Sequence, residues 1–215
     1  MGIWWEIMSI RKVELVNKEY YHVFNRGVER RDIFIDSEDL QFFFNGLLIF
    51  NKVDTSPFTQ SPEKFVDIVA YCLLPNHFHL LLRQVSDEGI SRFMQKLCTS
   101  YAKFFNKKYK RNGSLFQGRF KANHLNGEYA LPTLASYVNL NYKHHKIDRQ
   151  TRMVKSSIFE YLDMEMGRRI CSENEINNIL NEVGGLEEYK KYATNASISF
   201  ADNKNINLEN EDFSF

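Results

Sequence analysis

The chain of 215 residues is 43% hydrophobic and 26% charged, and 14% of its residues are aromatic. These values fit one globular domain with additional segments and exclude a disordered or collagen-like chain. No apolar run approaches the roughly 20 residues of a membrane-spanning helix, and the first ten residues lack the basic flank of a secretory signal. We therefore expect a cytoplasmic protein without a membrane partner. The three cysteines are widely spaced and odd in number, which predicts buried thiols rather than disulfides or a thiolate zinc site.

The net charge of +1 conceals a segregation of charge along the chain. Residues 91–155 contain fourteen basic side chains and two acidic ones, whereas residues 1–90 and 156–215 both carry a net negative charge. The basic segment is interleaved with aromatic residues, a composition that attracts a nucleic-acid backbone. The alternative is the solvated face of an ordinary helix, and charge alone leaves both interpretations open.

The first half of the chain predicts three strands and one helix. Residues Tyr20–Arg26 are rich in aromatic and β-branched side chains, which indicates a strand. Asp36 offers a helix N-cap, and apolar residues recur at helical spacing over 40–48. Val66–Leu74 and 77–85 are apolar runs joined by a Pro-Asn turn, which predicts an antiparallel pair of strands.

The second half predicts two more helices and one more strand. Residues 90–105 repeat apolar side chains at intervals of three and four opposite a basic face, as an amphipathic helix does. Residues 115–125 indicate a strand or hairpin around Gly118, and residues 131–146 a further helix with Pro132 near its start. This order of elements predicts an α+β fold: a ferredoxin-like split βαβ antiparallel sheet with an added C-terminal helix.

Two histidines of the third predicted strand are candidate metal ligands. His77 and His79 lie two residues apart, so both imidazoles face the same side of the sheet, while Phe78 faces the core. Imidazoles placed in this way can share one metal ion. The alternative is a pair of half-exposed strand histidines with no ligand, which is the commoner situation for an isolated His-x-His.

Two residues of the last predicted helix add candidate chemistry. Tyr137 and Asn141 are four residues apart and therefore lie on one face. Asn141 can offer an amide oxygen to a metal, and a metal would favour the phenolate of Tyr137 and polarise a phosphate. The alternative is an ordinary tyrosine of an amphipathic helix. The other histidines are weaker candidates, with His144 and His145 interpreted as phosphate contacts or plain surface and no role assigned to His22 or His124.

Several motifs together resemble the HUH single-tyrosine transposases, a family of insertion-sequence transposase-like proteins, and specifically the branch of REP-associated tyrosine transposases. The segment VAYCLLPNHFHLLL at residues 69–82 is similar to the signature strand pair of this family. The opening strand and turn resemble YHVFNRG at 21–27, and the basic hairpin resembles GSLFQGRFK at 113–121. The segment that carries the nucleophilic tyrosine of the family is similar to YVNLN at 137–141. The resemblance covers residues 20–165.

The resemblance implies a site and a reaction. His77 and His79 bind a divalent cation, Mg²⁺ or Mn²⁺, Asn141 completes the protein ligands, and Tyr137 attacks a DNA phosphate. Members of the family cut single-stranded DNA near a hairpin and leave a 5′-phosphotyrosine and a free 3′-hydroxyl. They act as monomers or homodimers. One departure is Tyr142, which follows Asn141 where the family usually has proline, so the helix is free to continue toward His145.

The resemblance and the composition of the remaining residues together predict four segments. Residues 1–19 form an N-terminal extension, within which Met8 is a possible working start. Residues 20–150 form the catalytic domain, and residues 151–194 add helical packing elements. Residues 195–215, rich in asparagine and acidic residues, form a mobile tail.

The basic segment then has a candidate role in holding hairpin DNA. We assign Arg119 and Lys121, beside Phe116, to the strand near the phosphate that is cut, and five residues of the preceding helix and turn to the stem: Lys103, Lys107, Lys108, Lys110 and Arg111. Two alternatives keep the same fold. One is a catalytically silent module that binds hairpin DNA or RNA, and the other is a metal-dependent phosphodiesterase that uses water as the nucleophile.

Overall fold

The computed structural model describes residues 13–53, 63–125, 131–145, 147, 153–162 and 169–202. Its centre is one sheet of five strands in the order β4-β1-β3-β2-β5, with every neighbouring pair antiparallel. The strands are β1 (Tyr20–Arg26), β2 (Val66–Leu74), β3 (His77–Gln84), β4 (Lys121–His124) and β5 (Lys155–Ser156). The first four strands stand in the order of a ferredoxin-like sheet, which confirms the predicted α+β fold.

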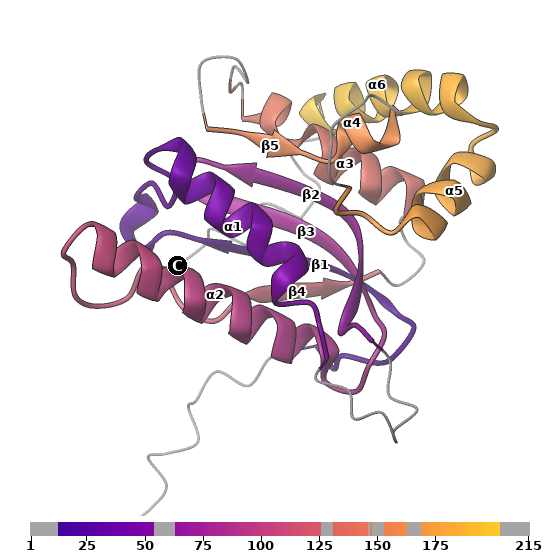
Figure 1. Ribbon diagram of the computed structural model, residues 1–215. Coiled ribbons are helices and arrows are strands. Elements are labelled where there is room, and N and C mark those ends of the chain that lie inside the picture. Colours follow the sequence, from indigo (N-terminus) through magenta and orange to yellow (C-terminus); the bar gives the residue numbers. More distant parts are fainter. Residues whose placement is uncertain are drawn as a thin grey trace, which may run out of the picture.

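The helices form two groups around this sheet. Helices α1 (Ser37–Ile49) and α2 (Gly89–Lys108) lie side by side over one face of the sheet (Figure 1). A short 3₁₀ turn at Val28–Arg30 lies between β1 and α1 in the chain. Away from them lies the second group (Figure 1), made of α3 (Leu131–His144), α4 (Ile158–Tyr161), α5 (Glu173–Glu182) and α6 (Leu186–Asp202). Helix α3 packs on β2 and β3 and is itself covered by α6.

The alternation of side chains along β3 decides which residues each group of helices meets. Phe78 is fully buried and packs against Phe43 of α1, with ring centroids 5.0 Å apart, and against Phe116, at 6.0 Å. His77 and His79 point to the opposite face, because side chains two residues apart in a strand share a face. That face is the one on which α3 packs, as the ring contact of His79 with Tyr137 demonstrates.

The helices and strands of two segments have other bounds than the patterns suggested. Of the residues 115–125, only Lys121–His124 form a strand. Phe116 makes an isolated antiparallel bridge with Gly27, and its ring turns into the core against Phe78 and Tyr101. The predicted mobile tail begins inside a helix, since α6 continues to Asp202. This helix is anchored on α3 by Tyr189, whose hydroxyl accepts a hydrogen bond from Asn139 Nδ2 at 2.9 Å.

Other predicted features lie outside the described residues, namely residues 1–12 of the N-terminal extension and residues 203–215 of the tail. The helices of the described segments include none with the length and apolarity required to cross a membrane. Cys72 and Cys171 are buried thiols that form no disulfide, as predicted, and Cys98 is a partly buried one.

Candidate metal centre and tyrosine

Three imidazoles converge between β3 and the end of α3. His77, His79 and His145 each offer one ring nitrogen, and these three atoms lie within 4.8 Å of one another. The closest contact is between His77 Nε2 and His145 Nε2, at 3.3 Å. His77 and His79 are buried and His145 is exposed. The predicted pair of strand histidines is therefore part of a group of three, which His145 completes from a distant segment.

Neighbouring side chains hold the two strand imidazoles by their Nδ1 atoms. Asn76 Oδ1 lies 2.6 Å from His77 Nδ1. An amide oxygen only accepts, so His77 Nδ1–H donates and Nε2 carries the free lone pair. His79 Nδ1 lies 2.9 Å from His22 Nε2, while His79 Nε2 is buried without a hydrogen-bond partner. Each strand histidine thus has its Nδ1 engaged and its Nε2 available for a cation, the usual arrangement for a metal-binding imidazole.

Burial keeps these imidazoles uncharged at neutral pH. Desolvation lowers the pKa of His22 to about 4. The pKa of His77 falls to about 3, because of burial first and then the nearby His145 and Arg26. Burial, with His22 and His77 adjacent, holds the pKa of His79 well below its usual 6.5. The neutral form is the one that binds a metal.

Asn141 of α3 carries an unsatisfied amide in the interior. Its exposed fraction is 0%, and neither Oδ1 nor Nδ2 has a hydrogen-bond partner. A buried polar group without a partner costs about 1–3 kcal/mol. Asn141 lies one helical turn from Tyr137 on one side and from His145 on the other, and the backbone N–H of His145 donates to the Asn141 carbonyl at 3.3 Å. A cation held by the imidazoles would give this amide oxygen a partner, so the donor set fits a divalent metal ion.

Tyr137 stands beside this cluster. Its ring centroid lies 5.8 Å from that of His22 and 6.2 Å from that of His79, both edge to face. His144 also stacks on the tyrosine ring, with centroids 5.3 Å apart and the planes 23° from parallel. Tyr137 is only 4% exposed. The structure therefore brings the predicted tyrosine together with the predicted imidazole pair.

A cavity of about 250 Å³ opens next to the two strand histidines. It is lined by β1, β3, the segment before β4 and the first residue of β4, and its lining includes the predicted DNA-binding residues Arg119 and Lys121, both exposed. Two side-chain hydrogen bonds tie that segment to β1: Asn25 Nδ2 donates to the Gly118 carbonyl, and Arg26 Nη2 donates to Gln117 Oε1, both at 3.0 Å. The cavity joins basic side chains to the candidate metal centre.

Two of the predicted DNA-binding residues make contacts within the protein. Phe116 is 6% exposed and packs in the core against Phe78 and Tyr101, so its ring faces no solvent on which a base can stack. Lys108 is engaged by three carboxylates, with its Nζ 2.7 Å from Asp36 and 2.9 Å from both Glu38 and Asp39. The aromatic ring of Phe116 and the charge of Lys108 predicted contact with DNA. In the structure, the ring packs in the core and the ammonium forms ion pairs with residues distant in the sequence.

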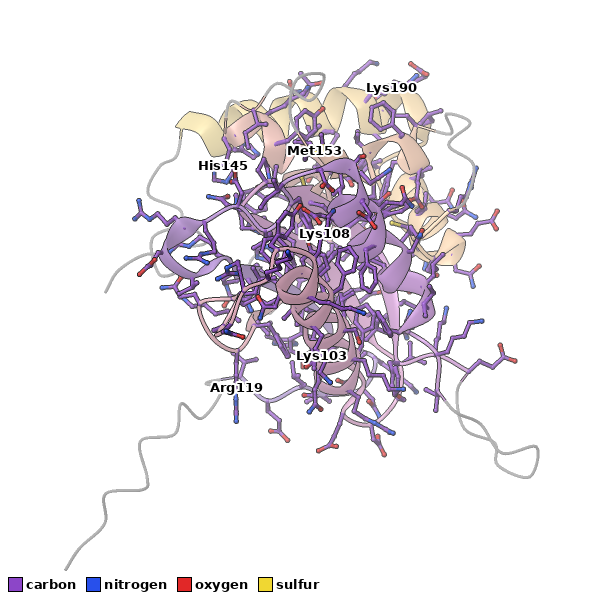
Figure 2. All side chains as sticks on the ribbon, turned by 60° about the vertical axis from the view of Figure 1, so that its left-hand side comes forward. Lys103, Lys108, Arg119, His145, Met153 and Lys190 are labelled. Atoms are coloured by element: carbon purple, nitrogen blue, oxygen red, sulfur yellow. The ribbon has the colours of Figure 1, made fainter. Side chains whose placement is uncertain are left out.

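The other predicted basic residues reach the surface. Lys103, Lys107 and Lys110 are exposed, and Arg111 is partly buried, with Nη1 donating to Asn106 Oδ1. Lys103 and Lys108 project from α2, whereas Arg119 lies before β4 and His145 just after α3 (Figure 2).

Sequence reasoning missed two residues of the site. His145 was interpreted as a phosphate contact or plain surface, although its spacing of four from Asn141 and eight from Tyr137 places it on their helix face. His22 had no signal beyond its place in a predicted strand, because its contact with His79 depends on the pairing of β1 with β3.

Comparison with known proteins agrees with this architecture. The family model described as "Transposase IS200 like" matches residues 15–141, more than half of the chain. A solved structure of a REP-associated tyrosine transposase bound to a REP hairpin has the same fold, with a TM-score of 0.51 and 14% sequence identity over 77% of this chain and 94% of that chain. A search of curated proteins found no matching sequence.

These findings define the class of the protein, a transposase with a ferredoxin-like sheet. Within that class, the chain belongs to the IS200-like transposase family, which confirms the family predicted from its motifs.

Proposed function

We propose that this transposase nicks and rejoins single-stranded DNA near hairpins, with Tyr137 as the nucleophile. The observation that carries the proposal is the position of the Tyr137 ring, 6.2 Å from the His79 ring, in the same cluster as the candidate metal ligands. A tyrosine on a different face of α3 would have no access to this cluster. The family membership supports the same assignment.

In the proposed reaction, the phenol oxygen of Tyr137 forms a bond to a DNA phosphorus, and the bond from that phosphorus to the 3′-oxygen of the preceding nucleotide breaks. The phenol proton is released, and the departing oxygen takes up a proton to become a 3′-hydroxyl. The DNA downstream remains attached to Tyr137 through its 5′-phosphate. Because one phosphate ester replaces another, a second strand with a free 3′-hydroxyl can reverse the step without ATP.

His77, His79 and Asn141 are the proposed ligands of a divalent cation, Mg²⁺ or Mn²⁺. Their support is the pair of Nε2 atoms on β3 and the unsatisfied amide of Asn141. When bound, such a cation withdraws charge from the phosphate oxygens and lowers the pKa of a neighbouring phenol. Asn76 and His22 keep the two imidazoles in a fixed orientation through their Nδ1 atoms.

We propose that Arg119 and Lys121 hold the strand near the cleaved phosphate. Both are exposed, and both line the cavity that adjoins His77 and His79. The exposed lysines of α2 and of the following turn are the candidates for the stem. The relative of the same fold is bound to a REP hairpin, which supports a hairpin as the substrate.

The test uses a single strand that carries a hairpin, with distinct labels at its two ends, incubated with Mn²⁺. The wild-type protein should form an SDS-resistant adduct with the downstream label, and the upstream fragment should be extendable from its 3′-hydroxyl. Tyr137→Phe should abolish the adduct. Tyr142→Phe, on the same helix five residues further on, serves as the control and should retain it.

The alternatives give different results in this assay. Cleavage without an adduct, by both the wild type and Tyr137→Phe, would establish water as the nucleophile. Tight hairpin binding without any cleavage would establish the catalytically silent binding module. Either result would overturn the proposed tyrosine chemistry.

A further inference from the structure

We propose that His145 is a third imidazole ligand of the cation site, and that the site therefore prefers a transition-metal ion such as Mn²⁺, Co²⁺ or Zn²⁺ to Mg²⁺. The inference rests on the cation site of the proposed function, not on its tyrosine chemistry. It adds a ligand to the set of His77, His79 and Asn141.

The first argument is the convergence of donor atoms. His145 Nε2 lies 3.3 Å from His77 Nε2, and one ring nitrogen each of His77, His79 and His145 fit within 4.8 Å. Two nitrogens bound to the same metal at about 2.0–2.1 Å are necessarily separated by about 3–4 Å, so the 3.3 Å contact between His77 and His145 already has the spacing of shared ligands. Among the described residues, this is the only group of three histidine, cysteine or carboxylate ligands whose donor atoms lie within 4.8 Å of one another.

The second argument is the register of α3. Tyr137, Asn141 and His145 follow one another at intervals of four, and the backbone hydrogen bond from His145 N–H to the Asn141 carbonyl continues the helical pattern to His145. Successive steps of four turn by about 40° around a helix, so the three side chains lie within one stripe. One rigid element thus presents the tyrosine, the unsatisfied amide and the third imidazole to β3.

The third argument is the chemistry of the donors. The group contains three imidazole nitrogens and, within the described residues, no carboxylate. Mg²⁺ favours oxygen ligands in octahedral geometry, whereas imidazole suits the later divalent ions. An additional nitrogen ligand raises affinity for Mn²⁺, Co²⁺ and Zn²⁺ along the Irving–Williams order and does little for Mg²⁺.

The experiment measures metal binding by the full chain without DNA. Calorimetric titration of the metal-free protein with Co²⁺ alone and with Mg²⁺ alone should give Co²⁺ affinity at least about 100-fold higher. His145→Ala should lose about 10- to 100-fold in Co²⁺ affinity while its Mg²⁺ affinity changes less than about threefold. His124→Ala is the matched control, because His124 of β4 contacts Glu19 instead, and should bind Co²⁺ as the wild type does.

A second measurement needs no variant. X-ray absorption at the cobalt edge of the loaded wild-type protein counts bound imidazoles and should find three. Two imidazoles, or a His145→Ala variant with wild-type Co²⁺ affinity, would overturn the proposal. If three imidazoles bind and no DNA adduct forms, the proposed function fails and the metal site stands. If an adduct forms with only two imidazoles bound, the third ligand is refuted and the proposed function stands.

Discussion

His22 Nε2 and His79 Nδ1 lie 2.9 Å apart in the interior, with the two rings 11° from parallel. Only one proton can occupy this contact when both rings are neutral. For His79 Nε2 to offer its lone pair to a cation, His79 must carry its proton on Nδ1, so Nδ1–H donates and His22 Nε2 accepts. His22 is therefore placed to favour the form of His79 whose Nε2 is available to the proposed cation.

We predict that His22→Phe lowers the affinity for Co²⁺ or Mn²⁺ by about 10- to 100-fold, because the ring volume is kept but the acceptor is lost. His22→Gln, whose amide oxygen can accept the same hydrogen bond, should recover part of that loss. Calorimetry of the metal-free variants measures both. Equal affinities for His22→Phe and the wild type would show that His22 serves packing alone.

We expect the amide of Asn141 to lower the stability of the metal-free protein and to raise its affinity for a metal ion. Its amide is fully buried and unsatisfied, so Asn141→Leu removes a polar group that costs stability and keeps a similar volume. We expect the free energy of unfolding of the metal-free protein to rise by about 1–2 kcal/mol, while metal affinity falls.

Chemical denaturation with and without Mn²⁺ makes this measurement, and Asn139→Leu is the contrasting variant. Asn139 is equally buried, but its Nδ2 donates to the Tyr189 hydroxyl, so its replacement should destabilise the protein. A loss of stability in Asn141→Leu would mean that its amide already has a partner in the metal-free protein.

The Lys108 ion pairs predict a role in stability rather than in DNA binding. Asp39 is 0% exposed and lies 2.9 Å from the Lys108 ammonium, so Lys108→Met leaves a buried carboxylate without its cation. We expect a loss of about 1–2 kcal/mol in the free energy of unfolding, with unchanged DNA affinity. The exposed neighbour provides the comparison, since Lys107→Met should leave stability unchanged and weaken DNA binding.

The ion pair between Lys108 and Asp36 makes the stability of the protein depend on pH. Hydrogen bonding from Lys108, and then from the Asp39 backbone, lowers the pKa of Asp36 from 3.8 to about 2. A carboxyl whose pKa is lower in the folded state stabilises the protein above its unfolded value and loses that contribution as the pH falls. The difference in unfolding free energy between the wild type and Lys108→Met should therefore shrink between about pH 4 and pH 2. A difference that is constant over this range would contradict the assignment.

Arg119 and Lys121 predict the salt dependence of DNA binding. Each phosphate contact contributes a slope of about −0.7 to −0.9 to the logarithm of affinity against the logarithm of salt concentration. Arg119→Gln and Lys121→Gln should each reduce the slope by about one such contact, measured by fluorescence anisotropy on a labelled hairpin. Lys190→Gln on α6 is the control, because Lys190 pairs with Glu187 and should leave the slope unchanged.

Much of this protein follows from its sequence alone. The apolar runs Val66–Leu74 and His77–Gln84, and the helical spacing in α1 to α3, are local patterns, and they determine the ferredoxin-like plan and the common face of His77 and His79. The interval between Tyr137 and Asn141 is equally local. The sequence motifs also sufficed to predict the transposase family.

Only the tertiary structure decided which other side chains join these residues. His22 meets His79 across 57 residues, His145 meets His77 across 68, and Lys108 meets Asp36 across 72. Such contacts depend on strand pairing and on the packing of α3 and α2, not on the character of each residue. His145, interpreted as a phosphate contact or plain surface, lies among the candidate ligands, and Lys108, predicted to contact DNA, forms ion pairs within the fold, because burial and partners are properties of the assembled chain.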